Sequence, residues 1–387
     1  MEGHADGYSS LILLNPLSPQ LICFQYVGYR TNRLIQLNLR CESSLKRFWF
    51  QHMTQLSAKP VHSDANRTNN YPPLFIVLNA SSGDKNTVSV ENRLATLLQD
   101  ANQPYELFLC RRPGDLDVMT KQAVEQARNC NGVVVAAGGD GTIRFVAQEV
   151  IAAGLPFGVL ALGTFNYFAR DNGLPQEVDA AVEVLIAGMR AGFERPVQVG
   201  QLNDQVFLVN ASLGLYPQLL ADREKFKQQH GRSRIVAKLA GLLTLLRRDT
   251  KMLLRIEHDG EKQQSAEDII PASTIFVGNN QLQLDNVGLT SEAQSVQNGQ
   301  IAVFALPPMR AAERMAVAFR GMLGLLDKSP DLTRFACRQL VVEPLNKRQY
   351  VKVAMDGEVS KMRPPLIFRV GPQPLRLIAA PSPGIEI

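Results

Sequence analysis

The amino-acid sequence predicts an α/β protein in which a parallel-sheet domain is followed by a domain of antiparallel strands. Strand-like and helix-like segments alternate from residue 74 to residue 189, whereas short strands dominate from Gly192 onward. Alternating strands and helices are typical of a parallel sheet covered by helices, and successive short strands are typical of antiparallel sheets. With 387 residues the chain also exceeds the usual size of one hydrophobic core. We therefore expect two domains.

The predicted first domain spans residues 71–195. Its strands are short apolar runs, and a helix-like segment follows each of them. The expected strands are Leu74–Leu78, Tyr105–Cys110, Val133–Ala137 and Phe157–Ala161, and the expected helices are Glu91–Asp100, Asp115–Arg128, Thr142–Ala153 and Val178–Met189.

The predicted second domain spans residues 196–387, and the last residues of the chain can return to the first domain. One long helical interruption is expected between about Pro217 and Arg248. The spacing of the other segments favours antiparallel pairing. The expected strands are Gln205–Asn210, Leu253–Glu257, Ser273–Gly278, Gly299–Ala305, Gln339–Glu343, Tyr350–Met355 and Pro365–Val370.

Residues 1–70 lack a sustained period of 2 or 3.6 and end in a polar run from His62 to Asn70. Such a pattern predicts a poorly ordered amino-terminal extension. An alternative is a start codon assigned too early, with Met53 as the true initiator, so that the first 52 residues are foreign to the native protein.

Composition favours a folded cytoplasmic protein. The net charge of +5 permits anionic partners without requiring nucleic acid, and we expect no nucleic-acid partner. The five cysteines include no CxxC pair, which indicates a reducing compartment. The amino terminus lacks the pattern of a signal peptide, and no apolar stretch reaches the roughly 18 residues needed to cross a bilayer. Any membrane contact is therefore expected to be peripheral, at the inner membrane face.

The most informative segment is the strand Val133–Ala137, which leads directly into Gly138-Gly139-Asp140-Gly141-Thr142 and a helix. Glycines let backbone N–H groups approach a phosphate closely, and the start of the helix adds a positive dipole end. The segment lacks the GK[ST] of a P-loop and the GxGxxG of a dinucleotide fold. A glycine-rich turn without a ligand is the alternative. Asp140 favours a ligand site, where it can hold Mg²⁺ or orient a hydroxyl, although a helix N-cap role stays open.

Two further polar turns follow neighbouring strands of the predicted sheet. The first is the turn Asn79–Gly83, and the second is the turn Leu162–Asn166. Both offer small hydroxyl or amide side chains that can contact phosphate or ribose. Each alone is compatible with an ordinary loop.

Together the three turns resemble those of the diacylglycerol kinase catalytic family, which includes bacterial lipid kinases and sphingosine kinases. The resemblance covers about residues 74–380, and Gly163–Arg170 is its most specific part, because Gly-Gly-Asp-Gly-Thr is also shared with NAD kinases. It implies an NAD-kinase-like, Rossmann-like domain, a carboxy-terminal antiparallel β-sandwich, and ATP between them. It further implies an ATP site lined by Asn79, Ser81, Gly83, Gly138, Gly139, Asp140, Gly141, Thr142 and Thr164.

The resemblance also gives a role to Asp356-Gly357-Glu358, which in isolation is typical of a hairpin turn. A similar Asp-Gly-Glu marks the catalytic region of the family. We assign Glu358 as the general base, with Asp356 and Asp140 completing an acidic cluster. The implied reaction transfers the γ-phosphate of ATP, with Mg²⁺, to the hydroxyl of a diacylglycerol-like lipid.

Three positions depart from the family pattern. Family members often carry Asp-Gly, with an associated structural Mg²⁺, where this chain has Asn298-Gly299, and Asn binds a hard cation less well. We therefore leave this metal site unassigned. The segment Gly278–Gln281 is altered as well, which bears on substrate selection. Cys110 stands near a position where members of the family often contact the nucleotide through a hydroxyl side chain. Alternatively, Cys110 is a small buried residue at the end of a strand.

A basic amphipathic segment, residues 219–255, can rest on anionic headgroups of a membrane. A core helix with a solvated basic face is the alternative. An NAD kinase and a catalytically inactive nucleotide-binding module are the competing functions, although the chain lacks the Asn-Glu dipeptide with which NAD kinases bind their dinucleotide. The sequence leaves the oligomeric state open.

Overall fold

The computed structural model of the protein describes residues 71–80, 87–112, 114–215, 217, 251–259, 266–345 and 349–380, together with two short strands near the amino terminus. Residues 1–59 and 60–387 form two separate units. In the first unit, β1 (Ser10–Leu13) pairs antiparallel with β2 (Ile22–Gln25). The predicted extension over residues 1–70 otherwise lies outside the described residues.

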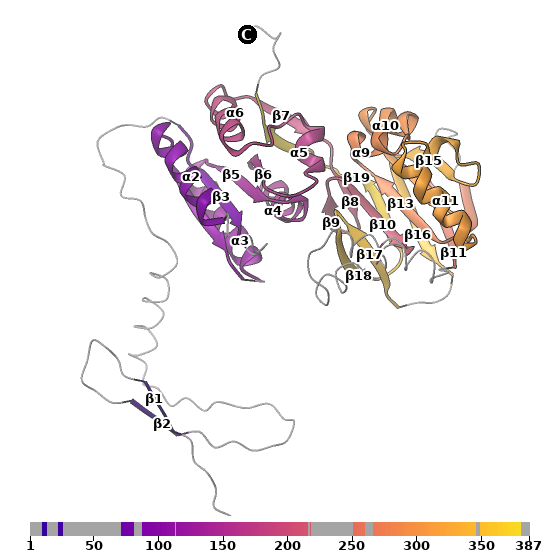
Figure 1. The fold of residues 1–387 in the computed structure, drawn as a ribbon, viewed down its shortest axis with the longest axis horizontal. Helices are drawn as coiled ribbons and strands as arrows, with labels where there is room; N and C mark the ends of the chain where they lie inside the picture. The colour runs from indigo at the N-terminus through magenta and orange to yellow at the C-terminus, as the bar shows by residue number, and fades with distance from the viewer. Residues whose placement is uncertain are drawn as a thin grey trace, which may run out of the picture. The chain divides into compact units, whose positions relative to one another are not determined.

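The larger unit begins with an α/β domain built on a six-stranded sheet in the order β4-β3-β5-β6-β20-β7 (Figure 1). The first four strands of this order are parallel to one another, and each contains apolar residues on both faces. The strands are β3 (Leu74–Asn79), β4 (Tyr105–Cys110), β5 (Val133–Gly138), β6 (Pro156–Ala161), β7 (Glu194–Val197) and β20 (Leu375–Ile378).

Helices cover both faces of this sheet, because successive strand side chains point to opposite sides. On one face, Val77, Val134 and Ala136 pack against α3 and α4. On the other face, Ile76, Val135 and Ala137 pack against α2 and α6. The helices are α2 (Thr87–Asp100), α3 (Asp115–Cys130), α4 (Asp140–Ala153), α5 (Tyr167–Asp171) and α6 (Val178–Arg190).

The sheet is completed from the far end of the chain. Strand β20, the yellow arrow beside β7 in Figure 1, lies parallel to β6 and antiparallel to β7. The chain therefore leaves the first domain after β7, forms the second domain, and returns.

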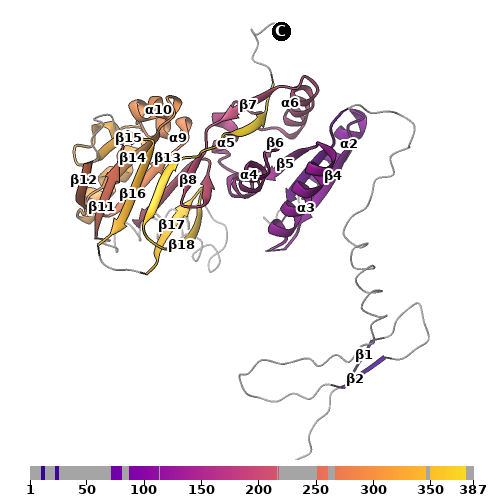
Figure 2. The same cartoon turned by 180° about the vertical axis from the view of Figure 1, so that it is seen from behind.

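The second domain is a sandwich of two antiparallel six-stranded sheets, in the orders β15-β14-β13-β10-β17-β18 and β12-β11-β16-β19-β8-β9 (Figure 2). Their facing side chains, among them Leu213, Val303 and Phe368, form one buried core. The fold class expected from the sequence is confirmed. The strands are β8 (Gly200–Leu202), β9 (Gln205–Phe207), β10 (Asn210–Gly214), β11 (Met252–His258), β12 (Ala266–Ala272), β13 (Thr274–Gly278), β14 (Ile301–Leu306), β15 (Thr333–Cys337), β16 (Gln339–Pro344), β17 (Val351–Met355), β18 (Glu358–Met362) and β19 (Leu366–Val370).

Helices that the sequence did not predict cover the outer face of the first of these two sheets. Leu284, Leu289 and Ala293 pack there against Ala302 and Phe304 of β14. The helices are α9 (Gln281–Asn286), α10 (Thr290–Gln297), α11 (Ala311–Met322) and the short 3₁₀ helix η1 (Leu326–Lys328). The long helix expected between Pro217 and Arg248 lies outside the described residues, except for Pro217 itself.

Candidate active site

The polar turns found in the sequence follow β3, β5 and β6, which are neighbours in the sheet. Because these strands are parallel, their carboxyl ends meet at one edge of the sheet, which is where α/β folds bind ligands. The three turns therefore lie at the same edge, as the sequence predicted.

Added side chains would clash at Gly138 and at Gly163, in the turns after β5 and β6. A Cβ at Gly138 would lie 2.7 Å from the Cβ of Thr142, and a Cβ at Gly163 would lie 2.7 Å from the Cα of Gly139. The turn after β6 therefore packs directly on the turn after β5. Close backbone approach of this kind leaves amide groups near the start of α4, where the helix dipole favours an anion.

Asn79 and Thr142 connect the first two turns. The Asn79 side-chain amide donates a 2.8 Å hydrogen bond to the buried Thr142 hydroxyl. The backbone of the next residue, Ala80, donates to the carbonyl of Cys110 at 2.9 Å. Ser81 and Gly83, the other predicted residues of this turn, lie outside the described residues.

Cys110 is buried at the end of β4, and burial raises the pKa of its thiol to about 11. The side chain is therefore neutral at physiological pH, in keeping with a small packed residue.

Asp140, the first residue of α4, holds the turn after β6. Its two carboxylate oxygens accept hydrogen bonds from the backbone N–H groups of Tyr167 at 3.3 Å and Phe168 at 3.2 Å. Burial raises the pKa of Asp140, whereas these amide donors lower it. The same turn is tightened by Asn166, which has a φ of 50° and accepts a 2.9 Å bond from the Gly163 amide. Thr164 lies exposed on this turn.

Glu358 reaches the Gly138–Thr142 loop from the second domain. It begins β18, directly across the hairpin from Met355. A Cβ built on Gly141 would lie 2.6 Å from Oε1 of Glu358, so the carboxylate rests against the loop. The side chain is 55% exposed and can therefore meet a ligand. The fold thus joins two motifs that are far apart in the sequence.

Arg144 fixes the position of Glu358. Its Nη2 donates a 2.7 Å charge-assisted bond to Oε2 of Glu358, and its side chain is only 9% exposed. The Nε of Arg144 has no hydrogen-bond partner within the described part of the chain. The sequence reading missed this residue. Its one signal is an arginine four positions after Asp140, among the apolar residues Ile143, Phe145 and Val146 of α4.

The carboxylate of Asp356 points inward and is hydrogen-bonded to backbone amides. It adopts a left-handed conformation, with a φ of 46°. Its carboxylate accepts hydrogen bonds from the amides of Leu208 at 2.7 Å, Val209 at 2.9 Å and Asn210 at 2.9 Å. Burial raises its pKa to about 6, although the amide donors and Arg144 lower it. Asp356 thus anchors the Asp-Gly-Glu turn to the start of β10.

The altered segment Gly278–Gln281 is tied to the site. Asn280 caps α9 and donates a 3.2 Å bond to the carbonyl of Tyr167, while Asp171 of α5 accepts from the Leu282 amide at 2.7 Å. This segment therefore helps to hold the turn after β6.

The described residues contain no group of three or more His, Cys, Asp or Glu side chains that could hold a metal ion. Asn298 is the C-cap residue of α10. Of the basic segment 219–255, the structure describes only residues 251–255, in which Arg255 pairs with Glu343 at 3.2 Å. Within the described part of the chain, no helix is long and apolar enough to cross a membrane.

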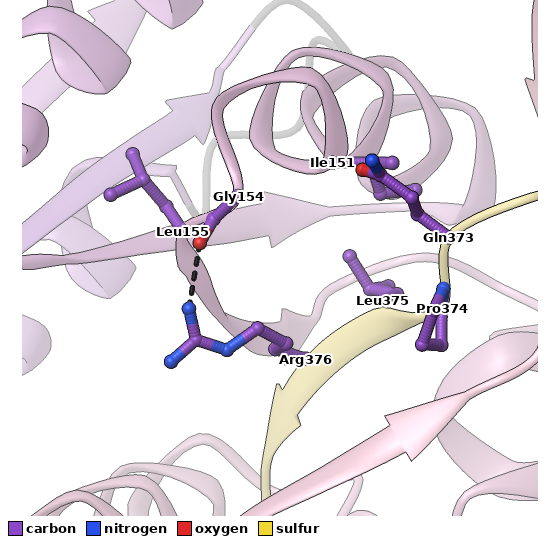
Figure 3. Close-up of a pocket in the computed structure, with 7 residues that line it drawn as sticks. All are labelled: Ile151, Gly154, Leu155, Gln373, Pro374, Leu375 and Arg376. Atoms are coloured by element: carbon purple, nitrogen blue, oxygen red, sulfur yellow. Dashed lines mark hydrogen bonds between the residues drawn. The ribbon is translucent and has the colours of Figure 1, made fainter.

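A separate pocket of about 230 Å³ lies at the opposite edge of the sheet (Figure 3). It is lined by Ile151, Gly154, Leu155 and residues 373–376, which precede or begin β6 and β20. Arg376 closes one side by donating a 2.7 Å bond to the carbonyl of Gly154. Because it sits at the amino-terminal ends of the strands, this pocket is distinct from the candidate active site.

Residues 73–202 match the family model of the diacylglycerol kinase catalytic domain. This segment is therefore similar to the catalytic domain of diacylglycerol kinases. It contains every candidate site residue except Asp356 and Glu358, which the second domain supplies.

Two curated relatives are similar to part of the chain. The chain is 30% identical over 146 residues to "Probable lipid kinase YegS-like" of Cronobacter sakazakii, and 29% identical over 150 residues to "Probable lipid kinase YegS" of Salmonella newport. These alignments cover 36% and 38% of the chain, and the chain spans about half of each relative, 45% and 46%.

Two solved structures from Bacillus anthracis share the fold. One, described as a candidate diacylglycerol kinase, has a TM-score of 0.59 at 19% identity, and another, described as a diacylglycerol kinase, has a TM-score of 0.56 at 19% identity. Each comparison covers 82% of this chain and 99% of the other.

Proposed function

We propose that this protein is an ATP-dependent lipid kinase that transfers the γ-phosphate of ATP to the hydroxyl of a diacylglycerol-like lipid. The single observation that supports this most strongly is the exposed carboxylate of Glu358 resting against Gly141 of the glycine-rich loop. A loop suited to phosphates and a carboxylate beside it are the two parts that phosphoryl transfer to an alcohol requires. The family of the first domain and the names of its relatives support the same reaction.

In this mechanism the loop holds the nucleotide. Backbone N–H groups of Gly138–Gly141 and the start of α4 face the phosphates, and the Asn79–Thr142 bond fixes the neighbouring turn. Mg²⁺ would come bound to the phosphates and neutralise their charge, because Mg²⁺ usually keeps several waters and few protein ligands.

Glu358 then acts on the lipid. Its carboxylate accepts the proton of the lipid hydroxyl as the hydroxyl oxygen attacks the γ-phosphorus, and the bond to the bridging oxygen breaks to release ADP. Arg144 keeps this carboxylate in place through its 2.7 Å bond. Asp140 and Asp356, whose oxygens accept backbone amides, act as positioning residues for the two turns.

One experiment separates this proposal from its competitors. The purified full chain is incubated with Mg²⁺, labelled ATP and either a total lipid extract or NAD. Label in the organic phase is the expected result. Label only in NADP would make the protein an NAD kinase, and binding of ATP without transfer to either acceptor would make it a nucleotide-binding module.

A further inference from the structure

The first crossing between the two domains carries a polar side chain, Gln198, that is bonded to the sandwich. Gln198 lies in the link, residues 198–199, between β7 of the first domain and β8 of the second (Figure 1). Its Nε2 donates a 2.8 Å hydrogen bond to Oδ1 of Asn279 and a 3.0 Å hydrogen bond to the carbonyl of Gln300. Asn279 follows β13 and Gln300 precedes β14, so one amide joins the crossing to two neighbouring strands. We call Gln198, Asn279 and Gln300 the Gln198 junction.

The buried side chain of Asn279 completes the network. Its Nδ2 donates to the backbone carbonyls of Gln198 and Leu208, each at 3.2 Å. A side-chain amide nitrogen carries two hydrogens, so every amide hydrogen of Gln198 and of Asn279 has an acceptor. Because backbone carbonyls only accept, they also fix which end of each side-chain amide faces them. The junction is therefore a closed set of hydrogen bonds among neutral groups.

The residues of the junction do not fit a divalent cation. Members of the family that the chain resembles often carry an Asp-Gly with an associated structural Mg²⁺ where this chain has Asn298-Gly299. Hard cations bind carbonyl and carboxylate oxygens, but each oxygen of the junction already accepts an N–H. Mg²⁺ gives up its water reluctantly, and negative ligands are needed to offset that cost. The three segments that meet at the junction contain no Asp or Glu; they are residues 196–203, 278–284 and 293–306.

The charge beside the junction is positive. Gly299 has a φ of 80°, and a Cβ built on it would lie 3.8 Å from Nη2 of Arg338 and 3.8 Å from Oε1 of Gln198. The guanidinium of Arg338 therefore lies where its charge would repel a divalent cation. The carboxylate of Asp259 accepts hydrogen bonds from the backbone amides of Arg338 at 2.8 Å and Gln339 at 2.9 Å. This carboxylate is thus bonded to backbone of the neighbouring strand.

The junction connects both domain crossings to the candidate active site. On the returning crossing, the Gly371 amide donates a 2.7 Å hydrogen bond to the carbonyl of Val199, which is next to Gln198. On the other side, Asn279 is followed directly by Asn280, the N-cap of α9, which donates to the carbonyl of Tyr167 in the turn after β6. Fixing Gln198 therefore fixes the place where the second domain meets this turn.

We propose that the side-chain amide of Gln198 takes the place of a structural cation in this chain. It draws together the oxygens of Asn279 and Gln300 and so fastens the domain crossing to the sandwich. Divalent cations therefore add no stability to the folded chain in the absence of nucleotide. The inference goes beyond the proposed function and does not depend on which substrate the protein phosphorylates.

The test measures the melting temperature of the full chain without nucleotide, in EDTA, in Mg²⁺ and in Ca²⁺. The parent protein should melt within about 1 °C of the same temperature in all three, because a ligand raises the melting temperature only if the folded state binds it. Gln198→Glu removes both donors and places a carboxylate against the Gln300 carbonyl. It should melt about 5 °C lower in EDTA, and Mg²⁺ or Ca²⁺ should recover part of this loss by bridging the new carboxylate and the carbonyl oxygens.

Gln201→Glu is the matched control, since it makes the same chemical change three residues along the chain. Oε1 of Gln201 accepts a 3.0 Å hydrogen bond from Nε of Arg369, and a carboxylate keeps this bond. This variant should melt no lower than the parent protein, with no response to cations. Gln198→Met removes the donors without adding a ligand, so it should melt lower in EDTA and gain nothing from Mg²⁺ or Ca²⁺.

Melting temperatures do not depend on catalysis, so failure of the proposed function leaves this test intact. A parent protein that melts more than about 3 °C higher in Mg²⁺ or Ca²⁺ than in EDTA would overturn the proposal, because its fold would then bind a cation. Equal melting temperatures of Gln198→Glu and Gln201→Glu in EDTA would also overturn it, since the donors of Gln198 would then contribute nothing. If Gln198→Glu fails to fold, the parent protein and Gln198→Met still decide the outcome by the same criteria.

Discussion

Gly141→Ala should separate catalysis from stability, because the nearest atoms to the added methyl group belong to Glu358, the proposed general base. The new Cβ would lie 2.6 Å from Oε1 and 3.3 Å from Cδ of Glu358. A carbon and an oxygen normally approach no closer than about 3.3 Å, so the carboxylate oxygen must move by about 0.7 Å or more. Glu358 can move, since its side chain is 55% exposed. A displacement near 1 Å at a reacting group can lower turnover by about 10²-fold.

The effect on folding should be small. Replacing glycine by alanine within a helix stabilises it by about 1 kcal/mol, and weakening an ion pair with one exposed partner costs about 0–1 kcal/mol. We therefore expect a free energy of unfolding within about 1 kcal/mol of the parent protein, with kcat lowered about 10²-fold. Gly321→Ala is the matched stability control, because its Cβ would lie 3.6 Å from the nearest atoms and gains the same helix propensity.

The measurements are urea unfolding and steady-state kinetics with ATP and a soluble lipid. A folded Gly141→Ala protein with unchanged kcat would refute the assignment of Glu358 as the base. A variant that loses ATP affinity and keeps kcat would show that the methyl group crowds the nucleotide rather than the carboxylate.

Three further changes test the roles of the remaining site residues. Glu358→Gln should lower kcat by 10²-fold or more while ATP affinity changes less than threefold, because the amide cannot accept the hydroxyl proton; single-turnover kinetics and ATP titration check this. Arg144→Met should lower kcat more than it raises the KM for ATP. Arg144→Lys should keep part of the kcat, because the lysine supplies a cation that can pair with Glu358. An equal loss of activity in both variants would count against a positioning role. Asp356→Asn should destabilise the protein by about 1–3 kcal/mol in urea unfolding, because its Nδ2 would face the amide of Leu208 in place of an acceptor. Burial raises the pKa of Asp356 in the folded protein to about 6, above its unfolded value near 4. The protonated carboxyl therefore stabilises the fold fully below pH 4, and this stabilisation is lost as the pH rises through about 6. The free energy of unfolding of the parent protein should therefore fall between pH 4 and 6, and Asp356→Asn should not show this fall. A free energy of unfolding that rises over this range would mean that the three amide donors outweigh burial.

Much of the first domain could be predicted because its signals are local. The apolar runs at β3, β4, β5 and β6 agree with the observed strands to within a residue or so, and the expected helices agree in position with α2, α3, α4 and α6. Helices α9, α10 and α11 were missed because their short amphipathic patterns lie among strands, and because α11 carries its large apolar residues on the outer face. The return of β20 to β6 depends on contacts between opposite ends of the chain.

The same division applies to the site. The sequence by itself determined the turns, because glycines and small polar residues at strand ends are required by local backbone geometry, and it placed Asp140, Asp356 and Glu358 on such turns. Only the tertiary structure decided what their carboxylates do. The carboxylate oxygens of Asp140 and Asp356 accept hydrogen bonds from backbone amides of distant segments. Glu358 stays exposed instead and is held against Gly141 by Arg144. A carboxylate's role depends on which donors surround it, and those donors come from parts of the chain that meet only when it folds.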